Sequence, residues 1–280
     1  MSGDQTLGFL AGAAAGVLVA RPWVTAAIAR APDYLVRTNV SGRRVAAVLG
    51  LPLALGGVVG LGGVYALDRA TALDLTTVRT ALALCLVIVV AAGAGYADDR
   101  RGDEPARGFA GHLAAGLRGH LTGGLVKIAG VGLAGVGAGF LLGGGWYVLE
   151  VAGLVGLGAN LFNLLDRAPG RAGKVALVAT SLLVLFGSAV WSVAVAGLAG
   201  ALLMCLVADL GERGMLGDAG ANPLGAALGL GLAVSLEREG RLIALALLVA
   251  INLASERWSF SRGIERVRWL RAIDRFGRHG

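Results

Sequence analysis

The stretch that decides the fold reads TALALCLVIVVAAGAGYADDRRGDEP and covers residues 80–105. Its first part, from Thr80 to Ala97, carries no charged side chain, whereas Asp98, Asp99 and two arginines follow at once. An uncharged apolar run of about 18 residues or more is long enough to cross a bilayer as a helix. The abrupt charge indicates where that helix leaves the membrane, and it raises the question of why carboxylates gather at the boundary.

The composition of the whole chain agrees with a membrane protein. Of its 280 residues, 56% are hydrophobic and only 15% are charged, and the mean hydropathy is +0.74. A water-soluble domain of this length needs more charge to cover its core, so that class is excluded. We predict an all-α, polytopic transmembrane helical bundle, with residues 1–280 as a single integral membrane domain. Nine apolar segments predict its spans, at about 7–29, 46–67, 78–97, 121–143, 146–165, 173–189, 192–209, 219–236 and 240–256.

Glycines are abundant inside these segments, as in GLPLALGGVVGLGG at 50–63 and GVGLAGVGAGFLLGGG at 130–145. In lipid, small residues let transmembrane helices approach each other closely. We therefore interpret most of these glycines as positions where helices pack, and not as phosphate-binding loops.

The basic residues are divided unevenly between the two sides of the predicted membrane. The predicted spans bring 20 of the 25 lysines and arginines to one side, where the C-terminal tail also lies. The opposite side carries only Arg69, Arg79, Arg238 and Arg241. Because positive residues mark the cytoplasmic side, we predict a multi-pass inner (plasma) membrane protein with its N-terminus outside and its C-terminus cytoplasmic. This bias explains the net charge of +7 without a nucleic-acid partner.

Acidic residues from separate loops are predicted on that same cytoplasmic face. The motif DDRRGD begins at Asp98, and adjacent carboxylates at a membrane boundary can bind a divalent cation that relieves their repulsion. The alternative is a solvated loop with internal ion pairs to Arg100 and Arg101. Other loops bring further carboxylates to this face, namely Asp166, Asp209, Glu212 and Asp218. Such convergence is what a single active site needs.

A second motif, NLFNLLD, closes the predicted segment 146–165. Its Asn160, Asn163 and Asp166 lie three residues apart and therefore share one helical face. Polar groups at this depth are costly unless they bind something; the alternative is hydrogen bonding between helices. The sequence RAPGRAGK follows and adds three candidate phosphate contacts, Arg167, Arg171 and Lys174.

A third motif, GDAGANPLG at 217–225, opens the segment 219–236. Asp218 is either a plain N-cap or part of a site, because the small residues around it would let a phosphate or metal reach a helix N-terminus that favours anions. Lys127 lies just inside the segment 121–143 and either snorkels to the surface or reaches a diphosphate.

The three motifs, DDxxGD, NxxNxxD and GDxGxNxLG in this order, resemble the polyprenyl-phosphate sugar-1-phosphate transferase superfamily (glycosyltransferase family 4). That family includes the phospho-N-acetylmuramoyl-pentapeptide transferase and the UDP-N-acetylglucosamine polyprenyl-phosphate transferases. The likeness covers nearly the whole chain. It implies about ten or eleven spans, and together with the nine segments counted above it gives an expectation of about 9–11. It implies a phosphoglycosyltransferase of cell-envelope biosynthesis with a cytoplasmic active site. Such an enzyme moves a sugar-1-phosphate from a nucleotide-sugar, UDP-linked, to a polyprenyl phosphate with Mg²⁺ (or Mn²⁺) and releases UMP.

The resemblance also implies roles for individual residues. Asp98 and Asp99 match the catalytic aspartate pair, of which the first deprotonates the lipid phosphate, and Asp218 together with Asp99 matches the metal site. The other matched positions contact substrate: Asn160, Asn163, Asp166, Arg107 at the place of a phosphate-binding lysine, and Asn39 in the first inner loop. Lys127 and Arg171 complete the set of candidate substrate contacts.

Two features of the sequence keep other functions open. The last loop has no histidine before His279, where the family has a histidine cluster, and Arg167-Ala168-Pro169-Gly170 stands where the family has glycines. One alternative is therefore a catalytically inactive relative that binds lipid. Another is a membrane transporter, since polar residues and glycine-rich helices occur there too, although its polar residues gather near the midplane. A homodimer is an open alternative for the assembly, and the sequence leaves the sugar undetermined.

Overall fold

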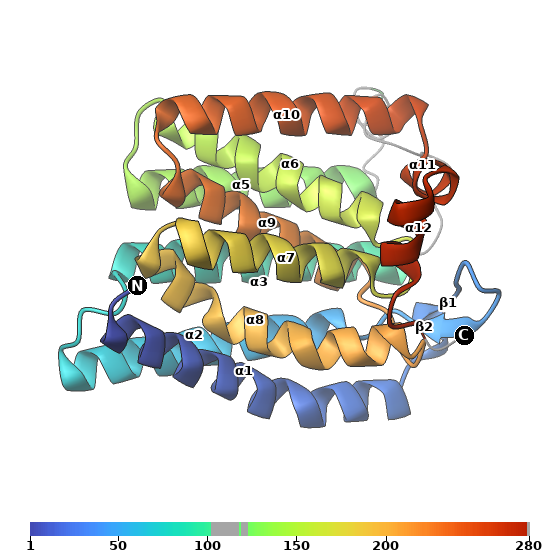
Figure 1. The fold of residues 1–280 in the computed structure, drawn as a ribbon, viewed down its shortest axis with the longest axis horizontal. Coiled ribbons are helices and arrows are strands. Elements are labelled where there is room, and N and C mark those ends of the chain that lie inside the picture. The colour runs from blue at the N-terminus through green and yellow to red at the C-terminus, as the bar shows by residue number, and fades with distance from the viewer. Residues whose placement is uncertain (102–117, 119–122, 279–280) are drawn as a thin grey trace.

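The computed structural model describes residues 1–101, 118 and 123–278. In this part of the chain, nine long helices lie side by side in one bundle (Figure 1). They are α1 (Gly3–Ala29), α2 (Gly50–Thr71), α3 (Val78–Arg101), α5 (Gly123–Leu142), α6 (Tyr147–Leu165), α7 (Arg171–Phe186), α8 (Ala189–Leu210), α9 (Asp218–Ser235) and α10 (Arg238–Arg257). Each begins and ends within four residues of a predicted segment. The prediction of a polytopic helical protein is confirmed.

Six of the described helices are long and apolar enough to cross a membrane, judged by length and composition alone. The number becomes seven if α10 and the short α11 (Phe260–Arg266), which meet at a bend of 89°, count as one broken span. The helix α7 has only 16 residues, fewer than a full crossing usually needs. The protein is therefore a multi-pass membrane protein, and the count of nine to eleven complete spans stays a prediction.

The predicted all-α class is confirmed for the described residues, apart from one short ribbon in the loop between α1 and α2. Strands β1 (Val36–Thr38) and β2 (Arg44–Ala46) form a two-stranded antiparallel ribbon in which Val36 pairs with Ala46. The turn is held by the side chain of Asn39, whose Oδ1 accepts hydrogen bonds from the backbone N–H groups of Ser41 and Arg43. The residue after β2, Ala47, forms a bridge with Met215 and so ties the ribbon to the loop before α9.

Many glycines of the bundle lie at helix contacts, as predicted for most of them, although a Cβ atom at Gly62, Gly93 or Gly156 would meet nothing within 4 Å. A Cβ atom at Gly16 of α1 would overlap the carbonyl group of Gly197 on α8, and one at Gly200 would overlap the backbone of Ala13. Glycine therefore sets the distance between α1 and α8 at these points, because any side chain would separate the two backbones.

The two chain termini lie at opposite ends of the bundle (Figure 1). The ribbon, α11 and α12 (Arg268–Arg275) gather at the end where the C-terminus lies. This arrangement agrees with one terminus on each side of the membrane. The assignment of the C-terminal end to the cytoplasm rests on the charge distribution and stays a prediction.

Candidate functional site

A cluster of polar side chains surrounds the ammonium group of Lys127 at the start of α5. Its Nζ atom donates to Asp98 Oδ2 at 2.8 Å and to Asp218 Oδ2. When the Asn163 amide is turned to suit both neighbours, its nitrogen lies 2.5 Å from Asp218 Oδ1 and its oxygen 3.0 Å from Lys127 Nζ. The side chains of Lys127, Asp98 and Asp218 are only 13%, 20% and 21% exposed. We call these four residues the central cluster.

The central cluster combines the ends of four helices, and two glycines bring the ends together. A Cβ atom at Gly95, one turn before Asp98, would overlap the backbone carbonyl of Asp218. Gly217 has φ +63°, which favours glycine, and a Cβ atom there would lie 2.9 Å from Asp99 Oδ2. The close approach of α3 to the start of α9 therefore requires glycine at both positions. Sequence reasoning counted Gly95 among ordinary contact glycines and missed this role.

Asp99 holds the N-terminus of α9. Its two carboxylate oxygens accept hydrogen bonds from the backbone N–H groups of Asp218, at 3.1 Å, and of Ala219, at 2.9 Å. The N-cap residue of α9 is Gly217, so the alternative of Asp218 as a plain N-cap is wrong.

The sequence also predicted that a phosphate could contact the backbone N–H groups at the start of α9, and the structure does not support this contact. Free N–H groups at a helix N-terminus attract anions. Here Asp99 already accepts the N–H groups of Asp218 and Ala219. Positive charge at this helix start comes from the side chain of Lys127, whose ammonium donates to Asp218.

Asp166 lies in a concentration of negative charge just beyond the end of α6. Its pKa is raised well above the ordinary value, chiefly because the carboxyl is buried and then because Asp209, Asp218 and Asp99 are near. The predicted convergence of acidic residues from separate loops is confirmed by these contacts. Their catalytic roles stay predictions.

Two cavities adjoin this acidic end of the bundle. The first, the α5–α10 groove, has a volume of about 330 Å³ and a largely apolar wall among membrane-spanning helices. Its polar and charged lining comes from Lys127, Asn160, Asn222, Asn252 and Glu256. The second, the loop pocket, has a volume of about 290 Å³ and includes Asn39, Asp166, Asp209 and Glu212 in its wall. A hydrocarbon chain suits the first cavity and a water-soluble group the second.

Two buried polar atoms in these walls have no hydrogen-bond partner among the described residues. They are Asn222 Nδ2, in the α5–α10 groove, and Asp209 Oδ2, in the loop pocket. Buried groups of this kind are rare unless a ligand satisfies them. Asn222 was not among the predicted site residues, and Asp209 was named only among the carboxylates expected on this face. The signal was present, because Asn222 lies in GDAGANPLG one helical turn after Asp218.

Two predicted substrate contacts have protein partners. Asn160 Nδ2 donates to Asn252 Oδ1 on α10 at 2.6 Å, which is the hydrogen bond between helices that the sequence left as an alternative. Asn39 Nδ2 donates to Glu212 Oε2 at 2.6 Å. Each residue still lines a cavity, so neither is removed from the candidate site.

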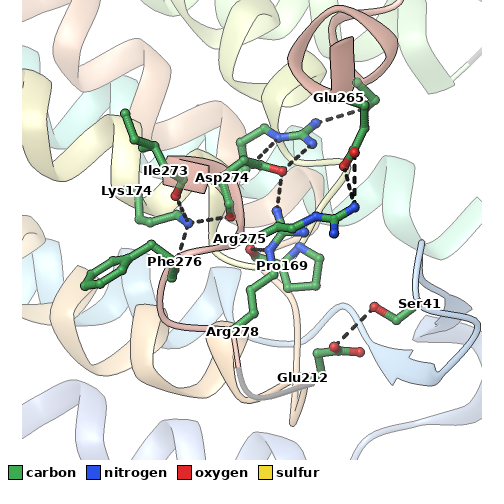
Figure 2. A network of polar contacts seen from close by, with 12 residues as sticks. Ser41, Pro169, Lys174, Glu212, Glu265, Ile273, Asp274, Arg275, Phe276 and Arg278 are labelled. Atoms are coloured by element: carbon green, nitrogen blue, oxygen red, sulfur yellow. Dashed lines mark hydrogen bonds and ion pairs between the residues drawn. The ribbon is translucent and has the colours of Figure 1, made fainter. Parts of the chain in front are cut away.

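Arg171 contacts the C-terminal segment. Its guanidinium donates to both carboxylate oxygens of Asp274, at 2.7 and 3.0 Å, and to Ser261 Oγ at 2.9 Å. Figure 2 shows Arg278 on the same carboxylate and Lys174 donating to backbone carbonyls around it. Burial raises the pKa of Asp274, but hydrogen bonds and charge from Arg171 and Arg278 outweigh it, and the pKa is lowered. Arg171 therefore anchors α12, and its expected phosphate contact is not supported.

The remaining predicted site residue, Arg107, lies outside the described residues. Among the described residues, no three histidine, cysteine, aspartate or glutamate side chains are grouped so that they could hold a metal by themselves. A magnesium ion needs only one or two carboxylates when substrate phosphates and water complete its oxygen ligands. Comparison of the chain with protein-family models and with curated proteins found no match.

Proposed function

We propose that this protein is a phosphoglycosyltransferase at the cytoplasmic face of the membrane. It transfers a sugar-1-phosphate from a nucleoside-diphosphate sugar, UDP-linked, to a polyprenyl phosphate and releases UMP. The observation that carries the proposal is the position of the central cluster. Lys127 belongs both to this cluster and to the wall of the apolar α5–α10 groove, while Asp166, whose carboxyl interacts with that of Asp218, lines the loop pocket. A lipid acceptor and a water-soluble donor can meet only at such a boundary.

The cluster suits the chemistry of phosphoryl transfer. A phosphate oxygen of the lipid attacks the β-phosphorus of the donor, the bond from that phosphorus to the bridging oxygen breaks, and the nucleoside monophosphate leaves. The product is a polyprenyl diphosphate sugar. Asp98 takes the proton of the lipid phosphate, so that the attacking oxygen is ionised. Lys127 pairs with phosphate oxygens and neutralises part of their charge.

The donor atoms of the cluster fit a magnesium ion shared with substrate. Two carboxylates, of Asp98 and Asp218, already converge on one cation, the Lys127 ammonium, and the Asn163 amide lies beside them. Hard oxygen ligands of this kind suit Mg²⁺ or Mn²⁺. When bound, the ion would neutralise charge on the donor diphosphate. Asp218 is the residue we assign to hold it, because Asp99 is engaged with the N-terminus of α9.

Asp218→Asn is expected to weaken the Mg²⁺ dependence of donor binding. The amide keeps the size of the side chain but removes the charge that attracts the ion. Calorimetric titration of the nucleotide-sugar at several Mg²⁺ concentrations measures this without any turnover. Superimposable titrations for the wild type and the variant would remove Asp218 from the metal site.

The experiment that tests the function is a donor screen on the purified protein. Undecaprenyl phosphate and Mg²⁺ are supplied with a panel of nucleotide-sugars, and UMP and the lipid diphosphate sugar are measured together. The two products must appear in equal amounts for one donor at least. If the protein binds undecaprenyl phosphate but no donor yields either product, the alternative of an inactive lipid-binding relative replaces the proposal.

The orientation in the membrane gives a separate prediction. We expect reporter fusions after residue 278 to read out in the cytoplasm, because the basic residues concentrate at that end. A fusion in the turn between α5 and α6, at Gly144, should read out on the opposite side. The reverse pattern would put the central cluster outside, where no cytoplasmic nucleotide-sugar reaches it.

A further inference from the structure

A second apolar groove lies on α1, α2 and α3, and the proposed reaction does not use it. Its volume is about 650 Å³, and the residues that matter for its ligand are Trp23, Leu51, Val89, Gly93 and Tyr96. We call it the α1–α3 groove. Trp23, Leu51 and Val89 are 55%, 47% and 52% exposed. Because all three belong to membrane-spanning helices, the groove opens toward the hydrocarbon of the bilayer.

Two arginines stand at the mouth of this groove, at the end of the bundle where the C-terminus lies. Arg30 belongs to its wall and follows directly after α1. The guanidinium of Arg100 lies 5.5 Å from the ring centre of Tyr34 and 5.9 Å from that of Tyr96. The two tyrosine hydroxyls are 3.2 Å apart. An apolar slot with two cations and two hydroxyls at its membrane-surface end matches a lipid that carries a negative headgroup.

We propose that the α1–α3 groove binds a hydrocarbon chain of an anionic membrane phospholipid, with its headgroup phosphate between Arg30 and Arg100. The polyprenyl phosphate is a less suitable occupant, because Lys127 lines the α5–α10 groove and does not belong to this one. The inference does not depend on the proposed function, since the binding needs no catalysis.

The bound lipid would also pack against the helix turn that carries Asp218 of the central cluster. The inner wall of the groove includes Ala219, whose N–H group donates to Asp99. A chain in the groove therefore packs against the first turn of α9, which carries Asp218. We expect phosphatidylglycerol to raise the melting temperature of detergent-purified protein more than phosphatidylcholine with the same chains.

A filled-groove variant tests the site directly. A Cβ atom at Gly93 meets nothing within 4 Å, so Gly93→Phe can place its ring in the groove without displacing the backbone. Gly62 on α2 is equally open, lies outside the groove wall and supplies the control, Gly62→Phe. Native mass spectrometry in mixed micelles counts bound phosphatidylglycerol. We expect the wild type and Gly62→Phe to retain one lipid that Gly93→Phe loses.

The headgroup is tested by Arg30→Gln, which leaves the groove volume unchanged. One arginine near an anionic surface corresponds to about a fivefold change in affinity. The preference for phosphatidylglycerol over phosphatidylcholine should therefore fall about fivefold. Equal lipid retention in Gly93→Phe and the wild type would overturn the proposal, and so would an unchanged preference in Arg30→Gln. A lipid-free dimer that Gly93→Phe dissociates would also overturn it, because a second copy would then occupy the groove.

The lipid itself is identified by competition. Added undecaprenyl phosphate should leave the phosphatidylglycerol count unchanged, whereas Gly156→Phe, in the wall of the α5–α10 groove, should lower binding of undecaprenyl phosphate only. One-for-one displacement of phosphatidylglycerol by undecaprenyl phosphate would overturn the assignment of the groove to a phospholipid. Because these readouts need no donor, they can succeed even if the donor screen finds no activity.

Discussion

Asp98→Asn is expected to lower turnover about 10²–10⁴-fold, the usual loss when a general base is removed. The amide oxygen can still accept the hydrogen bond of 2.8 Å from Lys127, whereas the carboxylate that acts as the base is lost. The variant loses the group that takes the proton of the lipid phosphate, while Asp218 still pairs with the Lys127 ammonium and limits the loss of stability. The helical bundle should remain intact, because asparagine has the size of aspartate.

The measurement is turnover with the donor that the screen identifies, together with the melting temperature and the affinity for undecaprenyl phosphate. Asp33→Asn is the control, because Asp33 is exposed and lies at the same end of the molecule. The Asp98 variant should lose turnover and keep the other two quantities, and the control should keep all three. Wild-type turnover in the Asp98 variant would remove this residue from the reaction.

Lys127→Met is expected to make the stability of the protein depend on Mg²⁺. The ammonium of Lys127 is the cation between the carboxylates of Asp98 and Asp218, and all three side chains are mostly buried. Removing one partner of a buried ion pair costs about 3–5 kcal/mol, because the charge left behind has no partner. In the wild type the ammonium satisfies this need, so added Mg²⁺ should change the melting temperature little. In the methionine variant Mg²⁺ should restore most of the lost stability.

Two further variants show whether charge is the cause. Lys127→Arg keeps the cation and should remain close to the wild type in its response to Mg²⁺. The double variant Lys127→Met with Asp218→Asn removes one of the two facing carboxylates, and it should recover part of the stability without metal. Thermal unfolding with and without Mg²⁺ measures all four proteins. If the methionine variant has the melting temperature of the wild type without metal, the ion pairs of Lys127 contribute nothing to the stability of the protein, and the prediction is wrong.

The helices of this protein could be predicted from the sequence because their signal is local. An apolar run that ends in charge, such as the one from Thr80 to Asp98, marks a helix by its length and its boundary by its composition. The structure moves no boundary of a predicted segment by more than four residues. The ribbon formed by β1 and β2 was missed, because strands of three residues carry too little alternation to be read.

The gathering of acidic residues at one end was also predictable, since it follows from counting spans. Asp98, Asp166 and Asp218 had to share a face if the helices alternate in direction. Their partners were not predictable. Lys127 contacts Asp218 across 91 residues of sequence, and Arg171 contacts Asp274 across 103. A local pattern holds no information about which side chain meets another over such distances.

The sequence by itself therefore determined that the chain is a helical membrane protein whose carboxylates meet at one end. The tertiary structure alone decided what each carboxylate does there. Asp98 and Asp99 are neighbours in the chain, yet one contacts a lysine and the other holds the start of α9. The physical reason is that Gly95 lets the end of α3 approach the start of α9 closely. Because adjacent residues of a helix point in different directions, Asp98 then reaches Lys127 and Asp99 reaches the backbone of α9. The sequence does not distinguish Gly95 from the other glycines at helix contacts. Only the tertiary structure shows that the backbone of Asp218 lies against it.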